Sequence, residues 1–167
     1  MSAVISACGR YRYHLARFDL GAGTKVAVFV MLNPSTADAE KDDRTLVKCR
    51  TFAAAWGFGR VEVVNLFAWR ATCPLELAKL SISEAIGPEN DEHIRRTVDA
   101  ANLVVAAWGD GKGPRVTSMI AERRRDVRAI IERDGIEIHR LSTLTKARNP
   151  RHPLYLKGVL RPEPMPC

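Results

Sequence analysis

The stretch that decides the fold is VAVFVMLNPSTADAEKDD, from Val26 to Asp43. It starts as an apolar, valine-rich run, Val26–Leu32, which is typical of a strand that is buried on both faces. The run breaks at Asn33-Pro34, and small polar residues and then carboxylates follow. A buried strand that leads into such a loop predicts an α/β sheet with polar chemistry at the carboxyl end of the strand.

Strand and helix patterns alternate along the rest of the chain. Short apolar runs predict three further strands, at Val61–Leu66, Leu103–Trp108 and Ile136–Leu141. Apolar residues at helical spacing, together with helix start and stop signals, predict helices at Asp43–Trp56, Pro74–Leu80, Ile86–Ala101 and Arg115–Arg133. This alternation predicts a single domain over residues 1–167, a three-layer αβα sandwich with a central, mainly parallel four-stranded sheet. Arg10–Leu20 is a candidate outer antiparallel strand, and the segment from Lys146 onward is expected to be a proline-punctuated loop.

The charge of the chain points to an anionic partner. Its 167 residues carry 26 Lys and Arg against 19 Asp and Glu, which gives a formal net charge of +7. Such a balance favours polyanions, so nucleic acid (DNA first) or a nucleotide is the partner that we expect. A solvated basic surface without any such partner is the alternative that charge alone leaves open.

Composition and pattern also exclude or disfavour several classes of protein. The apolar fraction of 46% excludes a disordered tail protein. No apolar run reaches the length that crosses a bilayer, and the N-terminus lacks a signal-peptide pattern. The four cysteines are scattered, with no Cys-x-x-Cys pair, which argues against a zinc site and a disulfide framework. We therefore expect a cytoplasmic protein with neither a membrane partner nor a metal.

Loops follow the four predicted strands and are expected to meet at one edge of the sheet. They contain Asn33-Pro34-Ser35-Thr36, Phe67-Ala68-Trp69-Arg70, Gly109-Asp110-Gly111-Lys112 and His152-Pro153. Asn, Pro, Ser and Gly are also ordinary turn residues, so each loop taken alone can be a simple turn. The expected convergence of all four is what predicts a site.

The first loop offers candidates for catalysis and binding. Asn33 brings an amide donor and an amide acceptor to the end of a strand, and Pro34 fixes the backbone beside it. Ser35 and Thr36 could bind an oxyanion, or they could cap the next helix instead. The loop alone does not decide between these roles.

Carboxylates follow the same loop. Asp38 is closest to the expected edge of the sheet and is a candidate base for activating water. Capping of the next helix is the alternative role for Asp38. Asp42 and Asp43 are better explained as carboxylates that the start of a helix favours.

The second loop begins with an unusual side chain. Asn65 ends an apolar run, and a carboxamide is costly to bury there without a partner. It could read the edge of a nucleobase, or it could hydrogen-bond to a neighbouring loop. Trp69 could stack on a base or cover the core, and Arg70 could meet a phosphate.

His152 lies near the end of the chain in a basic loop, between Arg148 and Arg151 on one side and a proline on the other. A histidine held in this way could donate a hydrogen bond to a developing anion, although a lone histidine is more often a surface residue. Lys112 lies in a glycine-rich loop that could approach phosphate through its backbone amides. That loop lacks the spacing of a Walker motif.

Segments from these loops together resemble the uracil-DNA glycosylase superfamily. MLNPS (Met31–Ser35) is similar to the first motif of the mismatch-specific branch. VVNLFAWRA (Val63–Ala71) is similar to the strand whose asparagine reads the uracil edge. VVAAWG, which ends at Gly109, is similar to a later strand, and RHPLYL (Arg151–Leu156) is similar to the last His-Pro loop, which enters the minor groove. The resemblance implies a uracil-DNA-glycosylase-like fold.

The chain resembles another family more closely, the bacterial and phage family called domain of unknown function 1643. The LNPSTAD, NLFAWRAT, IGPEND, AWG and RHPLYL stretches carry this resemblance over nearly the whole length. This family brings no established function.

The glycosylase resemblance implies a hydrolase that cleaves the N-glycosidic bond of a nucleobase in DNA or a nucleotide, with no metal or organic cofactor. Asn33 would position water, with Asp38 as a candidate base. Asn65 would read the edge of the base, and His152 would stabilise the leaving base. The resemblance and the loop positions together give a substrate site of Pro34, Ser35, Thr36, Asn65, Phe67, Trp69, Arg70 and Trp108. Phosphates would be held by Arg70, Lys112, Arg148 and Arg151.

Departures from the superfamily leave other functions open. The uracil-specific branch has a water-activating aspartate near the place of Asn33, whereas the mismatch-specific branch also has asparagine there. Leu154-Tyr155 replaces the Ser-Pro end of the last motif. The residue that would stack on the flipped base is Phe52, Phe67 or Trp69. A non-catalytic nucleic-acid or nucleotide-binding module, or a small-molecule enzyme that uses the same pocket, is the alternative.

Overall fold

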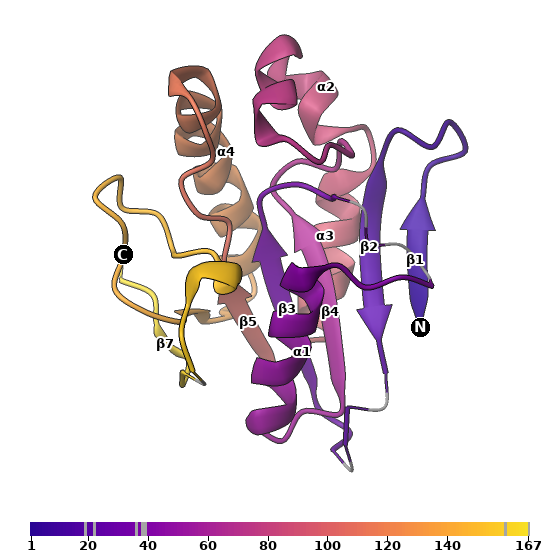
Figure 1. Ribbon diagram of the computed structural model, residues 1–167, viewed down its shortest axis with the longest axis vertical. Coiled ribbons are helices and arrows are strands. Elements are labelled where there is room, and N and C mark those ends of the chain that lie inside the picture. The colour runs from indigo at the N-terminus through magenta and orange to yellow at the C-terminus, as the bar shows by residue number, and fades with distance from the viewer. Residues whose placement is uncertain (19, 22, 36, 38–39, 159, 167) are drawn as a thin grey trace.

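The computed structural model describes residues 1–18, 20–21, 23–35, 37, 40–158 and 160–166. Within them, one seven-stranded sheet has the strand order β1-β2-β4-β3-β5-β6-β7 (Figure 1). The strands are β1 (Ser2–Ile5), β2 (Arg12–Arg17), β3 (Val26–Met31), β4 (Arg60–Asn65), β5 (Leu103–Ala106), β6 (Ile138–Arg140) and β7 (Glu163–Pro164).

Helices connect the strands, and local chemistry explains where several of them begin. They are α1 (Arg44–Ala55), α2 (Ile82–Ile86), α3 (Asn90–Asp99) and α4 (Pro114–Glu132), with short 3-10 helices η1 (Pro74–Lys79) and η2 (Pro153–Tyr155). Asp43 caps α1, because its Oδ1 accepts a hydrogen bond from the Leu46 backbone N–H at 2.8 Å. Ser81 and Glu84 form a capping box at the start of α2. The helix-start role predicted for Asp43 is therefore confirmed.

The centre of the sheet is the parallel core that the sequence predicts. β4, β3, β5 and β6 are neighbours and run parallel. The prediction of a four-stranded sheet is wrong, however, because three antiparallel strands extend the core to seven strands. β2 pairs with β4 and confirms the outer antiparallel strand expected within Arg10–Leu20.

The two outermost strands, β1 and β7, were not predicted. β1 pairs with β2, and the two residues of β7 pair with β6 inside the segment expected to be loop. β7 contains Pro164, which lacks a backbone N–H, and edge strands tolerate such a residue. β1 has only the short run Ala3–Ile5 and β7 has no apolar run, so the edge on which each one pairs decides its structure.

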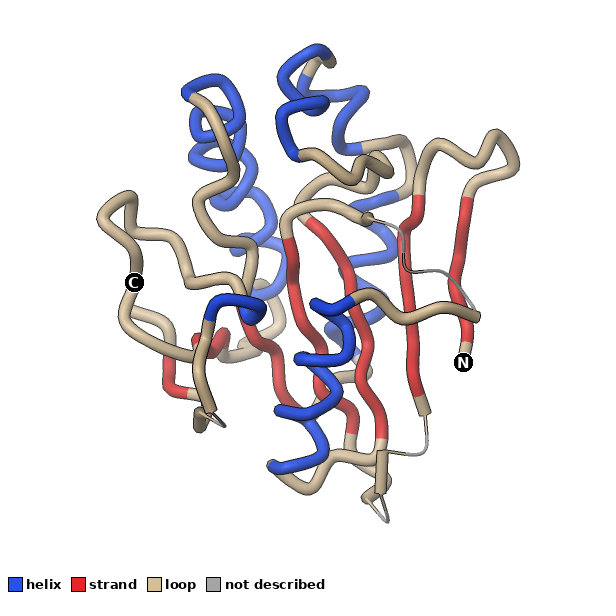
Figure 2. Tube along the Cα trace, in the orientation of Figure 1, coloured by secondary structure: helices blue, strands red, loops and turns tan. Residues whose placement is uncertain are grey.

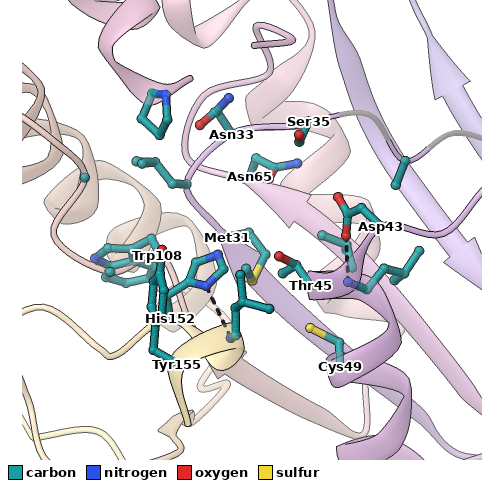
Figure 3. A pocket seen from close by; sticks show the side chains of 18 of the residues that line it. Met31, Asn33, Ser35, Asp43, Thr45, Cys49, Asn65, Trp108, His152 and Tyr155 are labelled. Atoms are coloured by element: carbon teal, nitrogen blue, oxygen red, sulfur yellow. Dashed lines mark hydrogen bonds between the residues drawn. The ribbon is translucent and has the colours of Figure 1, made fainter. Parts of the chain in front are cut away.

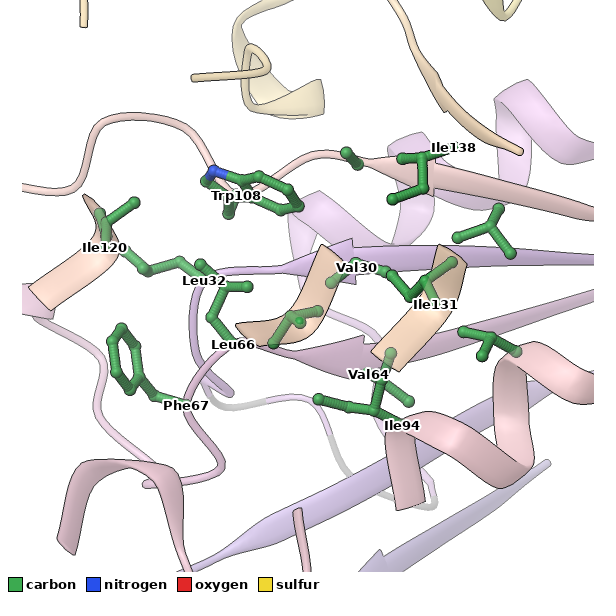
Figure 4. Close-up of a cluster of buried hydrophobic side chains, with 14 of the residues drawn as sticks. Val30, Leu32, Val64, Leu66, Phe67, Ile94, Trp108, Ile120, Ile131 and Ile138 are labelled. Atoms are coloured by element: carbon green, nitrogen blue, oxygen red, sulfur yellow. The ribbon is translucent and has the colours of Figure 1, made fainter. Parts of the chain in front are cut away.

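Helices cover both faces of the sheet and produce three layers (Figure 2). On one face, α1 packs its buried Leu46, Cys49 and Phe52 against the strands. On the other face, α3 and α4 pack against β3, β4 and β5 through a second buried cluster (Figure 4). The side chains of β3 alternate between these clusters, which is why its sequence is apolar throughout.

The connections of the parallel strands place a crevice at the carboxyl edge of the sheet. The chain leaves β3 toward β4 on one side and leaves β5 toward β6 on the other side. The carboxyl ends of neighbouring β3 and β5 therefore form a switch point, where α/β folds bind ligands. In the part of the chain that the structure describes, no helix is both long and apolar enough to span a bilayer.

Candidate functional site

A cleft of about 620 Å³ lies at this switch point (Figure 3). The loops after β3, β4 and β5, the start of α1, and η2 all contribute to its walls. Its volume is in the range of cavities that hold small organic ligands. Three of the four predicted loops therefore meet here among the described residues, whereas the second loop contributes Ala71 and Thr72 and none of Phe67–Arg70.

The floor of the cleft is apolar and lies on the α1 side of the sheet. Leu15, Met31 and Val63 contribute from three neighbouring strands, and Leu46 and Cys49 contribute from α1. Burial raises the pKa of the Cys49 thiol well above its ordinary value, so Cys49 is a neutral, apolar part of the wall. This floor suits a flat, weakly polar group.

Asn65 provides the polar group of the floor. It ends β4 opposite Met31 and is 1% exposed. None of the described residues forms a hydrogen bond with its Nδ2 or its Oδ1, although both atoms are buried. Two unpaired polar atoms at this depth cost roughly 1–3 kcal/mol each. A carboxamide kept in this state on a cleft wall is a candidate for ligand recognition.

The backbone at Asn65 is held by hydrogen bonds from residues that were not predicted as functional. Nδ2 of Asn90 donates to the carbonyl oxygens of Asn65 and Leu66, at 3.0 and 3.1 Å. Nε of the buried Arg123 also donates to the Leu66 carbonyl, at 2.9 Å, and its Nη2 pairs with Asp91. The IGPEND stretch signals Asn90, whereas nothing distinguishes Arg123 from the other arginines of its charged helix.

His152 faces the cleft from η2, and Asp43 and Thr45 face it from the start of α1 (Figure 3). Nδ1 of His152 accepts a hydrogen bond from the backbone N–H of Leu154 at 3.3 Å. Burial lowers the pKa of His152, and the negative charge of Asp43 opposes this shift only in part. The imidazole is therefore neutral near pH 7, with its proton on Nε2, which can donate to a ligand.

A hydrogen-bond network joins the loop after β5 to the segment that precedes His152. Asp110 Oδ1 accepts from Thr145 Oγ1 at 2.6 Å and from Asn149 Nδ2 at 2.9 Å. Asn149 Oδ1 in turn accepts from the indole Nε1 of Trp108 at 3.4 Å. Trp108 is 1% exposed and lines the cleft, so its place there is fixed by these partners.

Asn33 lies in the cleft, but its amide group is engaged with the protein. Its Nδ2 donates to the carbonyl oxygens of Ala71 at 2.8 Å and Pro34 at 3.1 Å. These bonds join the loop after β3 to the loop after β4 and leave the Oδ1 atom as the part of Asn33 that a ligand can use. Ser35 also lines the cleft, whereas Pro34 is buried and does not.

Two of the predicted residues, Thr36 and Asp38, lie outside the described residues. Within the described part, the cleft holds two other carboxylates, Asp43 and the hydrogen-bonded Asp110. The cleft also contains Arg12, which is 4% exposed and donates to the Ala37 carbonyl at 2.5 Å. Arg12 belongs to the outer strand β2, and its sequence pattern gave no reason to place it in a site.

The other predicted residues divide between the cleft and its surroundings. Lys112 and Arg151 are exposed and line the cleft. Phe67 is fully buried in the core on the α4 side, away from the cleft lining, and Arg148 is exposed outside that lining. Trp69 and Arg70 line a smaller neighbouring cleft instead. Fully buried Phe52 packs between Lys48 and Trp56, so it does not line the cleft either.

Comparison with known proteins identifies a family and no characterised relative. A family model described as "Protein of unknown function (DUF1643)" matches residues 12–154 of the 167. No curated protein and no solved structure shows a significant match to the chain. Among the described residues, no three His, Cys, Asp or Glu side chains form a group that could hold a metal ion. The chemistry of the cleft is therefore inferred from its geometry.

Proposed function

The chain belongs to the DUF1643 family of proteins of unknown function, and from the geometry of its cleft we propose that it hydrolyses the N-glycosidic bond of a nucleobase in a nucleotide or in DNA. The observation that carries this proposal is Asn65, a buried carboxamide that lines the cleft with both polar atoms unpaired among the described residues.

A nucleobase matches the two chemical features of the cleft floor. Its flat ring suits the apolar surface that Met31, Val63 and Leu46 provide. Its edge presents a hydrogen-bond donor next to an acceptor, which is what the carboxamide of Asn65 can pair with. Pairing would remove the cost of the unsatisfied amide, so Asn65 favours a ligand with this edge over an apolar one.

His152 is suited to assist departure of the base. As the glycosidic C–N bond breaks, its electron pair moves onto the base, and Nε2–H of the neutral imidazole donates to the developing anion. A neutral donor is adequate, because hydrogen bonding to the anion lowers the barrier without prior proton transfer. The lowered pKa of His152 keeps this neutral form present near pH 7.

Water completes the reaction by forming a C–O bond to the sugar carbon that the base leaves. Asp43 is the described carboxylate best placed to accept the proton of that water, because it lines the cleft while one of its oxygens caps α1. The cap holds the side chain in one orientation. Lys112 and Arg151 at the exposed rim would attract the phosphates of the substrate.

A binding module without catalysis is the second candidate, and one observation favours it. The amide nitrogen of Asn33 is tied to two backbone carbonyls, which reduces its capacity to position water. In that case Asn65 would read a base that the protein recognises and leaves intact.

Release of free base from oligonucleotides and nucleotides tests the proposal. The panel carries uracil, hydroxymethyluracil, mismatched thymine and deaminated purines, in single and double strands. We expect release by the wild type and a loss of about 10²-fold or more in His152→Gln and Asn65→Leu, because each loses a contact to the base. Arg125→Ala, an exposed change on α4, is the matched control and should keep full activity. Binding without release would select the binding module, and neither binding nor release would reject both.

A further inference from the structure

A second, smaller cleft of about 370 Å³ lies next to the first one. The turn between β1 and β2 contributes Arg10 to it, and the loop after β4 contributes Trp69 and Arg70. Ser35 and Thr72 line both clefts. The two clefts therefore adjoin at these residues.

The walls of this second cleft are held together by backbone hydrogen bonds. The backbone N–H of Arg70 donates to the Arg10 carbonyl, and that of Ala71 donates to the Pro34 carbonyl, both at 2.9 Å. Asn33 adds its bond to the Ala71 carbonyl at 2.8 Å. Three segments that are distant in the sequence thus form one frame, and the cleft exists before any ligand binds.

The side chains of the frame favour an anion. Arg70 donates from Nη1 to the Gly9 carbonyl at 3.1 Å, which fixes its guanidinium. Its Nε is buried and hydrogen-bonds to none of the described residues, so the guanidinium keeps a donor that the described part of the protein does not use. No acidic side chain is among the described residues that line this cleft, and Ser35 and Thr72 add hydroxyl donors.

The thiol of Cys8 shows that Arg10 can donate to an anion. Hydrogen bonds from the Ser6 hydroxyl, and then from the backbone and side chain of Arg10, lower the pKa of Cys8 to about 7. The Ser6 oxygen lies 3.3 Å from the Cys8 sulfur. Arg10 lines the second cleft, and the donors that favour a thiolate can favour another anion as well.

We propose that the second cleft binds a phosphate ester of the nucleotide whose base occupies the first cleft, with Arg10 and Arg70 as its cationic partners. This inference rests on the proposed function and narrows it, since it makes a phosphorylated nucleoside the unit that is recognised. A free nucleotide and a nucleic-acid strand both offer this phosphate chemistry.

Calorimetric titration of the full chain tests the inference with four kinds of probe. They are the nucleoside 5′-monophosphates of the five common bases, the matching nucleosides, ribose 5-phosphate, and trinucleotides without terminal phosphates. We expect a monophosphate to bind about tenfold more tightly than its nucleoside, which corresponds to one charge-assisted contact. Arg10→Ala and Arg70→Gln should remove that difference, whereas Arg125→Ala should keep it. Arg10→Ala serves as the second variant because Arg10 is exposed and its backbone bond to Arg70 remains.

The trinucleotides distinguish the two sources of phosphate. Tighter binding of a trinucleotide than of the monophosphate would assign the site to a nucleic-acid strand, and the reverse would assign it to a free nucleotide. Equal binding of nucleosides and monophosphates by the wild type would overturn the inference, as would an equal loss in Arg125→Ala.

The same titrations distinguish failure of the phosphate site from failure of the proposed function. Arg10-dependent binding of ribose 5-phosphate, with no nucleoside bound, would keep the phosphate site and reject base recognition by Asn65. Nucleoside binding that depends on Asn65 and gains nothing from a phosphate would keep base recognition and reject the second cleft. Binding of none of the probes would reject both.

Discussion

The side chain of Asn90 donates from Nδ2 to the main-chain carbonyl of Asn65 at 3.0 Å. One buried asparagine, at the start of α3, thus holds the backbone of another at the end of β4. The first is engaged with the protein, while the side chain of the second is left unpaired among the described residues. We conclude that Asn90 is a structural residue and that Asn65 is a candidate for ligand binding.

Replacing Asn90 should lower stability. Asn90→Ala would remove the side-chain donor of the Asn65 carbonyl and one of the two donors of the Leu66 carbonyl, which keeps its bond from Arg123, and should reduce the free energy of unfolding by about 2 kcal/mol. Urea unfolding followed by circular dichroism measures the change. Asn102→Ala is the control, since Asn102 is exposed and its Oδ1 accepts one bond from the Val26 N–H, and it should cost less than about 1 kcal/mol. If both substitutions lowered the free energy of unfolding equally, burial of Asn90 would add nothing to the stability that its hydrogen bonds contribute.

Replacing Asn65 should have the opposite effect on stability. Asn65→Leu exchanges an unsatisfied buried carboxamide for an apolar side chain of similar size, so the free energy of unfolding should rise by about 1 kcal/mol. Ligand binding in the base-release panel should be lost at the same time. A less stable Asn65→Leu protein would mean that the carboxamide has a partner in solution, and its role as a free reader of the base would fail.

His152 should make stability decline in mild acid. Its pKa is lowered by burial in the folded state, so the unfolded chain takes up the proton first as the pH falls. The free energy of unfolding should therefore decrease below about pH 6.5, the ordinary histidine value. Protonation also removes the Nδ1 acceptor of the Leu154 N–H.

Comparison with His152→Gln isolates this effect. The pKa of His93 is also lowered by burial, but His93 contributes equally to both proteins. Urea unfolding from pH 5 to pH 8 should show a steeper decline in the wild type than in the variant. Parallel curves would contradict a buried, neutral His152.

Asp42 should stabilise the fold through two arginines. It pairs with Arg17, whose side chain is 1% exposed, at 2.6 Å, and with Arg50, whose side chain is 36% exposed, at 2.5 Å. Asp42→Asn would leave the charge of Arg17 buried without its carboxylate and should cost about 3 kcal/mol. Arg50→Ala should cost less than about 1 kcal/mol, because the pair it breaks is partly exposed.

The stability that Asp42 contributes should decrease as the pH falls. Burial of Asp42 opposes its ionisation, but the hydrogen bonds from Arg17 and Arg50 outweigh burial and lower its pKa. Its contribution should be complete above about pH 4, the unfolded value, and should be lost as the pH falls below that. Urea unfolding of the wild type and of Asp42→Asn at pH 7 and pH 3 measures this contribution. If both proteins lost the same free energy of unfolding between the two pH values, the prediction for Asp42 would be contradicted.

The sequence predicted the parallel core because those strands are apolar on both faces. Val26–Leu32 is apolar throughout and Val61–Leu66 is apolar except for Glu62 and Asn65, and such short runs are typical of strands buried between two helix layers. β1 and β7 carry no such signal, and their pairing comes from edges that exist only after the core has formed. The outer strand β2 is largely buried, although its sequence RYHLAR is not apolar throughout.

The candidate site was predictable in its location and only partly in its members. Asn65 and His152 stood out because an amide after an apolar run and a histidine before a proline are unusual in any context. Arg12, Asp43 and Cys49 reach the cleft only because β2 and α1 pack beside β3 and β4. Phe67, by contrast, faces the core, because the chain bends after Asn65 in a way that local pattern does not encode.

By itself, the sequence determined the class of the fold and the edge of the sheet where polar residues gather. It also determined the order in which the loops follow the parallel strands along the chain. These features follow from hydrophobic periodicity and local turn chemistry. Only the tertiary structure decided which polar atoms are already satisfied. It showed that the amide nitrogen of Asn33 bonds to the protein and that the amide of Asn65 bonds to none of the described residues. Hydrogen-bond partners that are distant in the chain make that difference, and no single stretch of sequence contains it.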